Sequence, residues 1–190
     1  MAAAEDLLDV TLRDFLERLA SREPAPAAGS VAALTVAMAA AVLTKAARAS
    51  AEIWTEARGV VAQAEALRNR VAPLAQLDAE AYAQAQQALQ KPEDTELRRT
   101  MTRAADIPLR IAEVAADVAA LGTVVAEHGD PATRADAVAA AMLAEAGAHA
   151  ASELVAVNLL SLPEDERVLR ARELERAAAE SAERAAAAHE

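Results

Sequence analysis

The stretch REPAPAAGSVAALTVAMAAAVLTKAARAS, residues 22–50, decides the fold of this chain. It opens with two prolines that force extended backbone, and Gly29 and Ser30 then lead into a long run of small apolar residues. We predict that Ser30 is the N-cap of a helix, because a serine hydroxyl accepts a hydrogen bond from a free N–H of the first turn. The helix is expected to reach about Ala57. Its many alanines leave room for neighbouring backbones, which predicts a central place in a helical bundle.

The composition of the whole chain supports the same interpretation. Hydrophobic residues make up 54% of the 190 positions and aromatic residues only 2%, and most of the apolar residues are alanines. Alanine is the best helix former and is depleted in strands. Because an alanine buries little area, the helices must pack along much of their length, and an oligomer would bury more. The sequence shows no strand pattern, no regular repeat and no sustained heptad, so we predict an all-α bundle of five to six long, kinked, alanine-rich helices.

Capping residues and prolines place the ends of these helices. Thr11 and Asp14 form a relaxed capping box at the first helix. Pro73 and Pro108 fall inside helical segments and should kink or split them. In the run Gly129-Asp130-Pro131, the three residues suit a C-cap, an N-cap and a first helical position. The expected helices cover about 12–23, 30–57, 60–90, 95–127, 131–160 and 163–190.

Residues 1–162 are expected to form one helical domain. The segment 163–190 is then a separate, polar C-terminal helix, opened by a capping box at Ser161. Its repetitive end, ERAAAESAERAAAAHE, is expected to fray, as chain ends without firm packing do.

Charge and cysteine content exclude several classes of protein. The net charge of -11 argues against a nucleic-acid partner, since phosphate binding needs clustered lysines and arginines. With no cysteine, the chain has no disulfides and no cysteine-based zinc site. The apolar run Val31–Leu43 is shorter than the roughly 20 residues of a membrane span, and the acidic start is unlike a secretory signal. We expect a soluble cytoplasmic protein with no membrane partner.

Four segments in order resemble one known family. They are PAPAAGSVAAL (24–34), LDAEAYAQAQQAL (77–89), AADIPLRIAEVA (104–115) and HGDPATRADAVAAAMLAEAGAHAASELVAVNLLSL (128–162). They are similar to the Pro-x-Pro-Gly-Gly-Gly-Ser turn, the Asp-x-x-Ala-Tyr/Phe segment, the Ala-x-x-Val-Pro-Leu stretch and the closing Asn-Leu helix of the formiminotransferase-cyclodeaminase C-terminal domain and methenyltetrahydrofolate cyclohydrolase family. The resemblance covers nearly the whole chain, from about Phe15 to Leu162.

This resemblance implies an all-α homodimer with a folate site in a crevice near the dimer interface. It implies one of two reactions on tetrahydrofolate derivatives. A cyclodeaminase closes 5-formimino-tetrahydrofolate to 5,10-methenyl-tetrahydrofolate and releases ammonia, and a cyclohydrolase adds water to 5,10-methenyl-tetrahydrofolate to give 10-formyl-tetrahydrofolate. Neither reaction needs a metal or a tightly bound cofactor. Both need proton transfer beside a positively charged one-carbon centre, which suits a carboxylate.

The resemblance raises Asp78 and Asp136 as candidates for this proton transfer. Asp136 lies in the second turn of an apolar helix, where it could equally be a surface residue that interacts favourably with the helix N-terminus. Asp78 could equally be an exposed acidic position. Tyr82 lies four residues after Asp78 and shares its helix face, so it is a candidate ligand contact.

Further candidate ligand contacts are Ala27, Ala28, Gly29, Ser30, Arg48 and Arg103. Ser30 and the N–H groups behind it form a helix N-terminus, which suits an anion, although a plain N-cap explains the serine too. The family has three glycines where this chain has Ala27, Ala28 and Gly29, and alanine does not readily adopt the φ > 0 that glycine allows. For Arg48 and Arg103 the alternative is a solvated surface charge.

Three functions compete at this point. The first is a folate one-carbon enzyme, the second is a degenerate member of the same fold that binds folate or a protein without turnover, and the third is a plain helical interaction protein. The altered glycine turn motivates the second. His128 and His149 are far apart in sequence and carry no metal-binding pattern, so we predict no metal site. Asn158, polar in an apolar run, is expected to hydrogen-bond backbone near a helix end.

Overall fold

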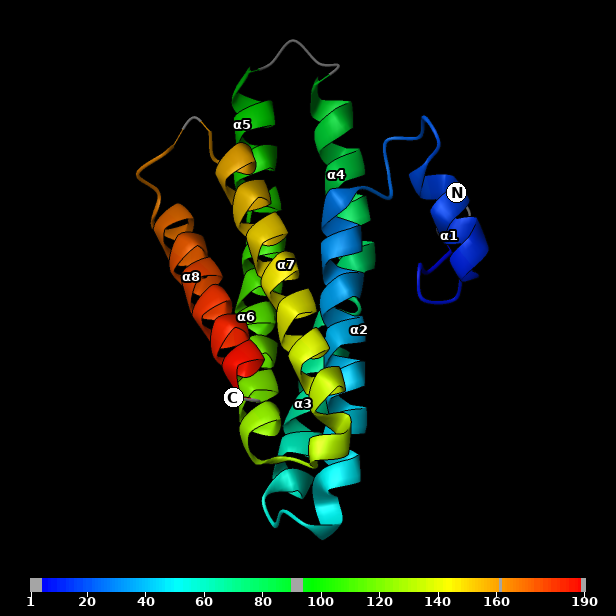
Figure 1. Ribbon diagram of the computed structural model, residues 1–190. Helices are drawn as coiled ribbons and strands as arrows, with labels where there is room; N and C mark the ends of the chain where they lie inside the picture. The colour runs from blue at the N-terminus through cyan, green and yellow to red at the C-terminus, as the bar shows by residue number, and fades with distance from the viewer. Residues whose placement is uncertain (1–4, 90–93, 161, 189–190) are drawn as a thin grey trace.

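The computed structural model describes residues 5–89, 94–160 and 162–188, and over these ranges every regular element is a helix. Figure 1 shows long helices running up and down beside one another, with a short N-terminal helix to one side. This confirms the predicted all-α bundle. The elements are α1 (Leu12–Leu19), α2 (Ala28–Ala49), η1 (Ser50–Glu52), α3 (Ala57–Val71), α4 (Leu74–Leu89), α5 (Asp94–Ala104), α6 (Asp106–His128), η2 (Pro131–Thr133), α7 (Arg134–Asn158) and α8 (Glu166–Ala187).

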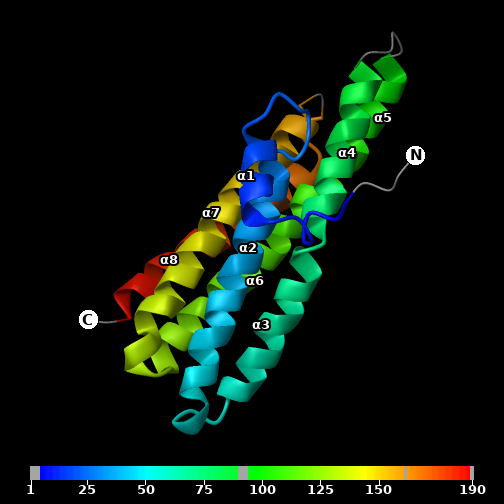
Figure 2. The same cartoon turned by 90° about the vertical axis from the view of Figure 1, so that its right-hand side faces the viewer.

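Two of the long helices are interrupted near a proline, as the sequence predicts. Helix α3 ends at Val71 and α4 begins at Leu74, directly after Pro73. Figure 2 shows α3 and α4 continuing in one direction alongside α2. Helices α5 and α6 are separated only by Ala105, and Pro108 lies in the first turn of α6, where its missing N–H has no intrahelical acceptor to lose.

Helix α2 is the centre of the bundle. It packs against α7, α3, α6 and α4, and its buried residues are mostly alanines that lie on several sides of the helix. Helices α6 and α7 approach still more closely at a glycine: a Cβ on Gly122 of α6 would lie only 2.9 Å from the Cβ of Ala141 on α7. The stretch Ala28–Glu52 has the length and hydropathy of a membrane span. However, 61% of its apolar 18-residue window is buried within the bundle, as in the core helix of a helical protein.

Ala40 provides a stability test of this packing. Its side chain is 0% exposed, so Ala40→Leu should overpack the core and destabilise the protein by about 1–3 kcal/mol. For a chain of this size that lowers Tm by roughly 2–10 °C. Circular dichroism melting measures the change, with Ala49→Leu on the exposed face of the same helix as the control. An unchanged Tm for Ala40→Leu would contradict the central place of α2.

Local capping signals are confirmed at two helix ends. The Thr11 hydroxyl accepts a hydrogen bond from the Asp14 N–H at 3.1 Å, as the capping box predicts. Gly129 is the C-cap of α6, and the Asp130 side chain accepts from the Ala132 N–H at 2.9 Å. Pro131 then begins a short 3-10 turn, and the α-helix itself starts three residues later than expected.

The predicted start of the last helix is wrong. Helix α8 begins at Glu166, and its N-cap is Asp165, which accepts from the Arg167 N–H. The capping box expected at Ser161 lies outside the described residues. Helix α8 is continuous to Ala187 and packs along α6 and α7 through an apolar stripe that includes Val168, Leu174 and Ala178.

The predicted N-cap of the central helix is also wrong. Helix α2 begins at Ala28, and Ser30 is its third residue, fully buried. The N-cap residue Ala27 has no side chain that could hydrogen-bond the free N–H groups. The reason is that the Asp78 side chain of α4, described below, lies at this end of α2.

Candidate functional site

A pocket of about 270 Å³ lies where the N-terminus of α2 meets α4, α5 and the C-terminal end of α7. Its volume is close to the lower end of the range for small-molecule sites, about 300–1,000 Å³. Most of its wall is apolar, and the polar side chains come from α4 and α7. The lining residues are Ala27, Ala28, Gly29, Asp78, Ala81, Tyr82, Ala85, Gln86, Met101, Ala104, Leu154, Val157 and Asn158.

Asp78 of α4 places its carboxyl group over the N-terminus of α2. Burial raises the pKa of Asp78 above its ordinary value of 3.8, and hydrogen bonding from the Ser30 backbone N–H and hydroxyl opposes this rise without cancelling it. The Ser30 hydroxyl has one proton, and its nearer acceptor is the Ala75 carbonyl at 2.8 Å, against 3.4 Å to Asp78 Oδ2. The Asp78 carboxyl group therefore lies at the N-terminus of α2 as a cap supplied by another helix.

Gly29 makes this arrangement possible. A Cβ at this position would overlap all three atoms of the Asp78 carboxyl group. Gly29 is buried in the first turn of α2, so its lack of a side chain is what lets the carboxyl group reach the helix end.

The alanines that replace family glycines fit their backbone without strain. Ala27 has φ -136° and ψ -163°, which is ordinary extended backbone, and Ala28 is the first residue of the helix. Over the described ranges no residue, glycine included, has a positive φ. The exchange of glycine for alanine at Ala27 and Ala28 therefore carries no conformational penalty.

Tyr82 and Gln86 lie one and two turns beyond Asp78 on α4 and line the same pocket. The Gln86 side-chain amide donates to the Tyr82 hydroxyl at 2.9 Å. This leaves the Tyr82 O–H able to donate to a ligand, since its oxygen is the acceptor in that bond.

Asn158, the last residue of α7, is a pocket residue that the sequence did not single out as a site residue. The expected hydrogen bond to backbone is wrong: within the described ranges its side-chain amide has no hydrogen-bond partner. The signals in the sequence were a polar residue in the apolar run VAVNLLSL and the resemblance of that run to the family's closing Asn-Leu helix. Neither signal says where the side chain points.

The structure separates Asp136 from Asp78. Asp136 is partly exposed near the start of α7 and pairs with the Lys45 ammonium group at 3.1 Å. Along α2, the contact with Asp78 is at Ser30 and the contact with Asp136 is at Lys45. At 1.5 Å per residue these contacts lie about 22 Å apart, so the two carboxylates do not act in one pocket of one chain.

The two candidate arginines also lie outside the pocket lining. Arg48, near the end of α2, forms an ion pair with Glu65 of α3. Arg103 is exposed on α5, next to the lining residue Ala104. Of the candidates, the structure brings together Ala27, Ala28, Gly29, Asp78 and Tyr82 at the pocket, with Ser30 directly behind Asp78.

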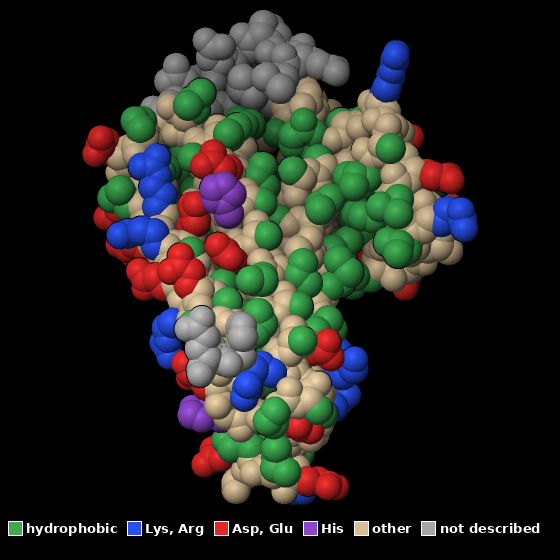
Figure 3. Space-filling view, in the orientation of Figure 1, with side chains coloured by type: hydrophobic (Ala, Val, Ile, Leu, Met, Phe, Trp, Pro, Cys, Tyr) green, Lys and Arg blue, Asp and Glu red, His purple; other side chains and the backbone are tan. Residues whose placement is uncertain are grey.

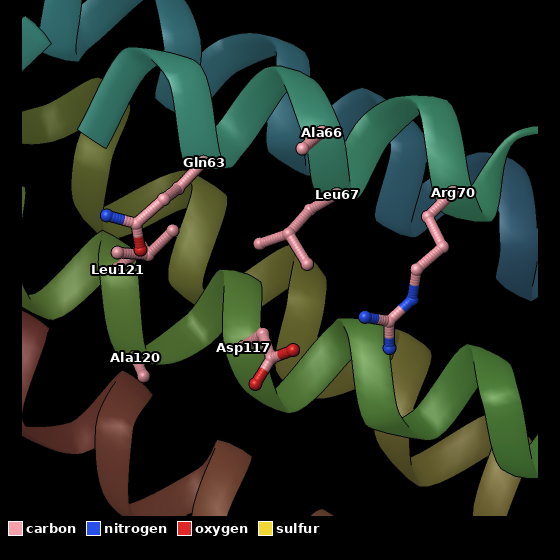
Figure 4. Close-up of a pocket in the computed structure, with 7 residues that line it drawn as sticks. All are labelled: Gln63, Ala66, Leu67, Arg70, Asp117, Ala120 and Leu121. Atoms are coloured by element: carbon pink, nitrogen blue, oxygen red, sulfur yellow. The ribbon is translucent and has the colours of Figure 1, made fainter. Parts of the chain in front are cut away.

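A larger depression of about 440 Å³ lies between α3 and α6. Figure 4 shows Leu67 and Arg70 of α3 facing Asp117 of α6 across it. The Arg70 guanidinium group of α3 lies 3.7 Å from the Glu113 carboxylate of α6. The charged side chains here are exposed to solvent, so this groove lacks a desolvated group suited to acid–base chemistry.

Histidines and carboxylates of the described segments form no cluster of three or more that could hold a metal ion. His128 lies against the Trp54 ring, with the ring centroids 6.0 Å apart. His149 of α7 pairs with Glu175 of α8. Both histidines therefore have contacts within the bundle away from the pocket.

Comparison with known proteins agrees with this architecture. A family model described as formiminotransferase-cyclodeaminase matches residues 11–180. A methenyltetrahydrofolate cyclohydrolase of Methylorubrum extorquens is 31% identical over 167 residues, covering 80% of each chain. The formimidoyltransferase-cyclodeaminase of Sus scrofa is 30% identical over 176 residues, which are 85% of this chain and 32% of the porcine protein. This chain thus spans about a third of that relative's length.

A solved structure shares the fold over almost the full length. A formiminotetrahydrofolate cyclodeaminase from Thermotoga maritima superposes with a TM-score of 0.87 at 24% identity, over 95% of this chain and 96% of that one. Since the family model covers most of the residues and a relative of similar extent is 31% identical, this chain belongs to the formiminotransferase-cyclodeaminase family.

Proposed function

We propose that this protein is an enzyme of folate one-carbon metabolism that acts as a cyclohydrolase on 5,10-methenyl-tetrahydrofolate or as a cyclodeaminase on 5-formimino-tetrahydrofolate. The observation that carries the proposal is the Asp78 carboxyl group, with its raised pKa, in an otherwise largely apolar pocket. The names of the relatives supply the substrate class. Ala27, Ala28, Gly29 and Tyr82 form the ligand-contacting wall, and the tetrahydrofolate derivative is the substrate, with no tightly bound cofactor.

In the cyclohydrolase reaction, Asp78 acts first as a general base. Water adds its oxygen to the cationic methenyl carbon while the Asp78 carboxylate takes one proton. The bond from that carbon to N5 then breaks, N5 takes up a proton from the carboxylic acid, and the formyl group stays on N10. Of the two protons of water, one ends on N5 and the other is released to solvent. A carboxylate also stabilises the positive charge of the bound substrate.

In the cyclodeaminase reaction, the Asp78 carboxyl group carries a proton from N10 to the nitrogen that leaves. N10 attacks the carbon of the protonated formimino group, and a C–N bond forms. The proton of N10 passes through the Asp78 carboxyl group to the departing nitrogen, which leaves as ammonia. The cationic methenyl product is left beside the ionised carboxylate. The same pocket therefore supports either reaction, and the substrates distinguish them.

The first measurement follows the absorbance of 5,10-methenyl-tetrahydrofolate with and without the purified protein. Decay that is faster with protein establishes the cyclohydrolase. Without such decay, ammonia release from 5-formimino-tetrahydrofolate tests the cyclodeaminase. A rise in Tm with either ligand but no turnover would indicate the degenerate folate-binding member of the fold. No turnover and no rise in Tm would contradict the proposal.

We also propose that two copies form a homodimer in the cytoplasm, with neither nucleic acid nor a membrane as a partner. Support comes from large apolar side chains that are exposed in the single chain: Leu12 is 71% exposed, Leu16 54% and Met38 57%. Figure 3 shows hydrophobic side chains gathered over α1 and the neighbouring part of the bundle. Sedimentation equilibrium should give about twice the 19.7 kDa chain mass, and a single-chain mass would contradict the dimer.

A further inference from the structure

The four polar side chains that line the pocket differ in what they already bind. Asp78 accepts hydrogen bonds from Ser30, and Gln86 donates to Tyr82. Asn158 is the exception, since within the described ranges its carboxamide has no hydrogen-bond partner. It is half-buried at the end of α7 and lines the pocket. A carboxamide that faces a largely apolar cavity without a partner is suited to bind a polar group of a ligand.

The chemistry of a carboxamide defines the group it would bind. Asn158 offers one acceptor oxygen and one donor NH₂ side by side. The complementary arrangement is a cyclic lactam, whose ring N–H and C=O point in the same direction. The reduced pterin ring of a tetrahydrofolate has such an edge, formed by N3–H and the C4 carbonyl. The C4 carbonyl of this edge is attached next to the ring carbon that carries N5, so the edge lies close to the one-carbon centre.

We propose that Asn158 is a specificity-determining residue that holds the N3–H and C4=O edge of the pterin ring by a pair of hydrogen bonds. Asp78 comes from α4 and Asn158 from α7, so two separate helices position the two ends of the ring system. This inference rests on the proposed function, because it takes a tetrahydrofolate derivative as the ligand. The role concerns binding of the ring and involves no proton transfer.

The test replaces Asn158 by leucine, which has nearly the same size and shape but no hydrogen-bonding group. Because the Asn158 side chain bonds nothing within the described ranges, the fold should be unaffected, and an unchanged Tm without ligand checks this. We expect KM for the folate substrate to rise roughly ten- to a hundredfold, the range for two lost neutral hydrogen bonds, with kcat within about threefold. The matched control is Asn69→Leu, at the exposed asparagine of α3.

Binding of two substrate fragments separates this role from a general effect on pocket shape. Calorimetric titration with 6-methyl-tetrahydropterin should show affinity falling in Asn158→Leu by the same factor as KM rises. Titration with p-aminobenzoyl-glutamate should show no difference from the unchanged protein. Equal pterin affinity in both proteins would overturn the inference, and so would an equal loss for both fragments or a fall in kcat at constant KM.

The fragment titration also keeps this inference distinct from the proposed function. If the unchanged protein binds the pterin fragment but turns over neither folate substrate, the enzyme proposal fails while the effect of Asn158→Leu still decides the binding role. If the unchanged protein binds no pterin at all, the inference about Asn158 is overturned together with the folate ligand.

Discussion

Asp78→Asn is expected to lower kcat by about 10²–10⁴-fold, the contribution typical of a positioned acid–base group. Asparagine has almost the same shape and keeps an oxygen that can accept from the Ser30 N–H, but it cannot take up a proton. The exchange also removes a charge whose burial is unfavourable, so the fold should retain its stability. Steady-state rates and Tm of the purified variant measure both effects together.

Two further variants make the Asp78 result specific. Glu80→Gln removes a carboxylate from the same helix, at a position that accepts from the Gln76 amide on the exposed face, and should keep the full rate. Asp136→Asn should keep it too, because Asp136 pairs with Lys45 at the far end of α2. A rate lost in Asp136→Asn and kept in Asp78→Asn would move the chemistry to the other end of the bundle and contradict the assignment.

The pH dependence of the rate should report the Asp78 carboxyl group. General-base catalysis needs the ionised form, so kcat should fall as the pH decreases through the pKa of Asp78, which burial holds above 3.8. The effect on stability has the opposite sign. Because the folded-state pKa is the higher one, protonation favours the folded state, and the destabilisation due to Asp78 is present above the folded-state pKa and disappears as the pH falls below it.

Gly29→Ala is expected to lower the rate by about a hundredfold or more. The new Cβ would overlap the Asp78 carboxyl group, and that group, at the end of a side chain, must turn away from the helix end. A displacement of about 1 Å in a reacting group is enough for a loss of this size. The free N–H groups of α2 also lose their acceptor, which costs about 1 kcal/mol of stability and lowers Tm by only a few degrees.

Gly59→Ala is the matched control for this exchange. Gly59 lies in α3, and a Cβ there would meet nothing within 4 Å. Alanine is favoured over glycine inside a helix by about 1 kcal/mol, so Tm should rise slightly while the rate stays the same. If Gly29→Ala kept its rate as Gly59→Ala does, the contact between Asp78 and the end of α2 would have no part in catalysis.

The sequence predicts the parts of the fold that depend on neighbouring residues. The cap at Thr11 and the break at Pro73 were correct because each involves a side chain or ring acting on its own few turns of backbone. Ser30 was misplaced as an N-cap for the opposite reason: the acceptor at that helix end is Asp78, 48 residues away along the chain.

For the candidate site, too, neighbouring residues in the sequence do not decide which residues come together. Asp78 and Asp136 look alike in sequence, as acidic residues on alanine-rich helices. What separates them is which end of α2 each one reaches, and this follows from helix lengths and directions in three dimensions. Asn158 could not be assigned for a related reason, since the other helices that build its pocket, α2, α4 and α5, all end about 30 residues or more before α7 begins.

The alanine-rich interior has a further consequence for the entropy of the site. An alanine side chain has no rotamers, so ordering it on folding loses no side-chain entropy, and the same residue has no alternative conformations to sample afterwards. The walls around Asp78 include Ala27, Ala28, Ala81 and Ala85, which cannot repack around an incoming ligand. On this part of the wall, binding therefore immobilises no side chain, and the ordering that a more flexible wall undergoes with its ligand is already complete there when the chain has folded.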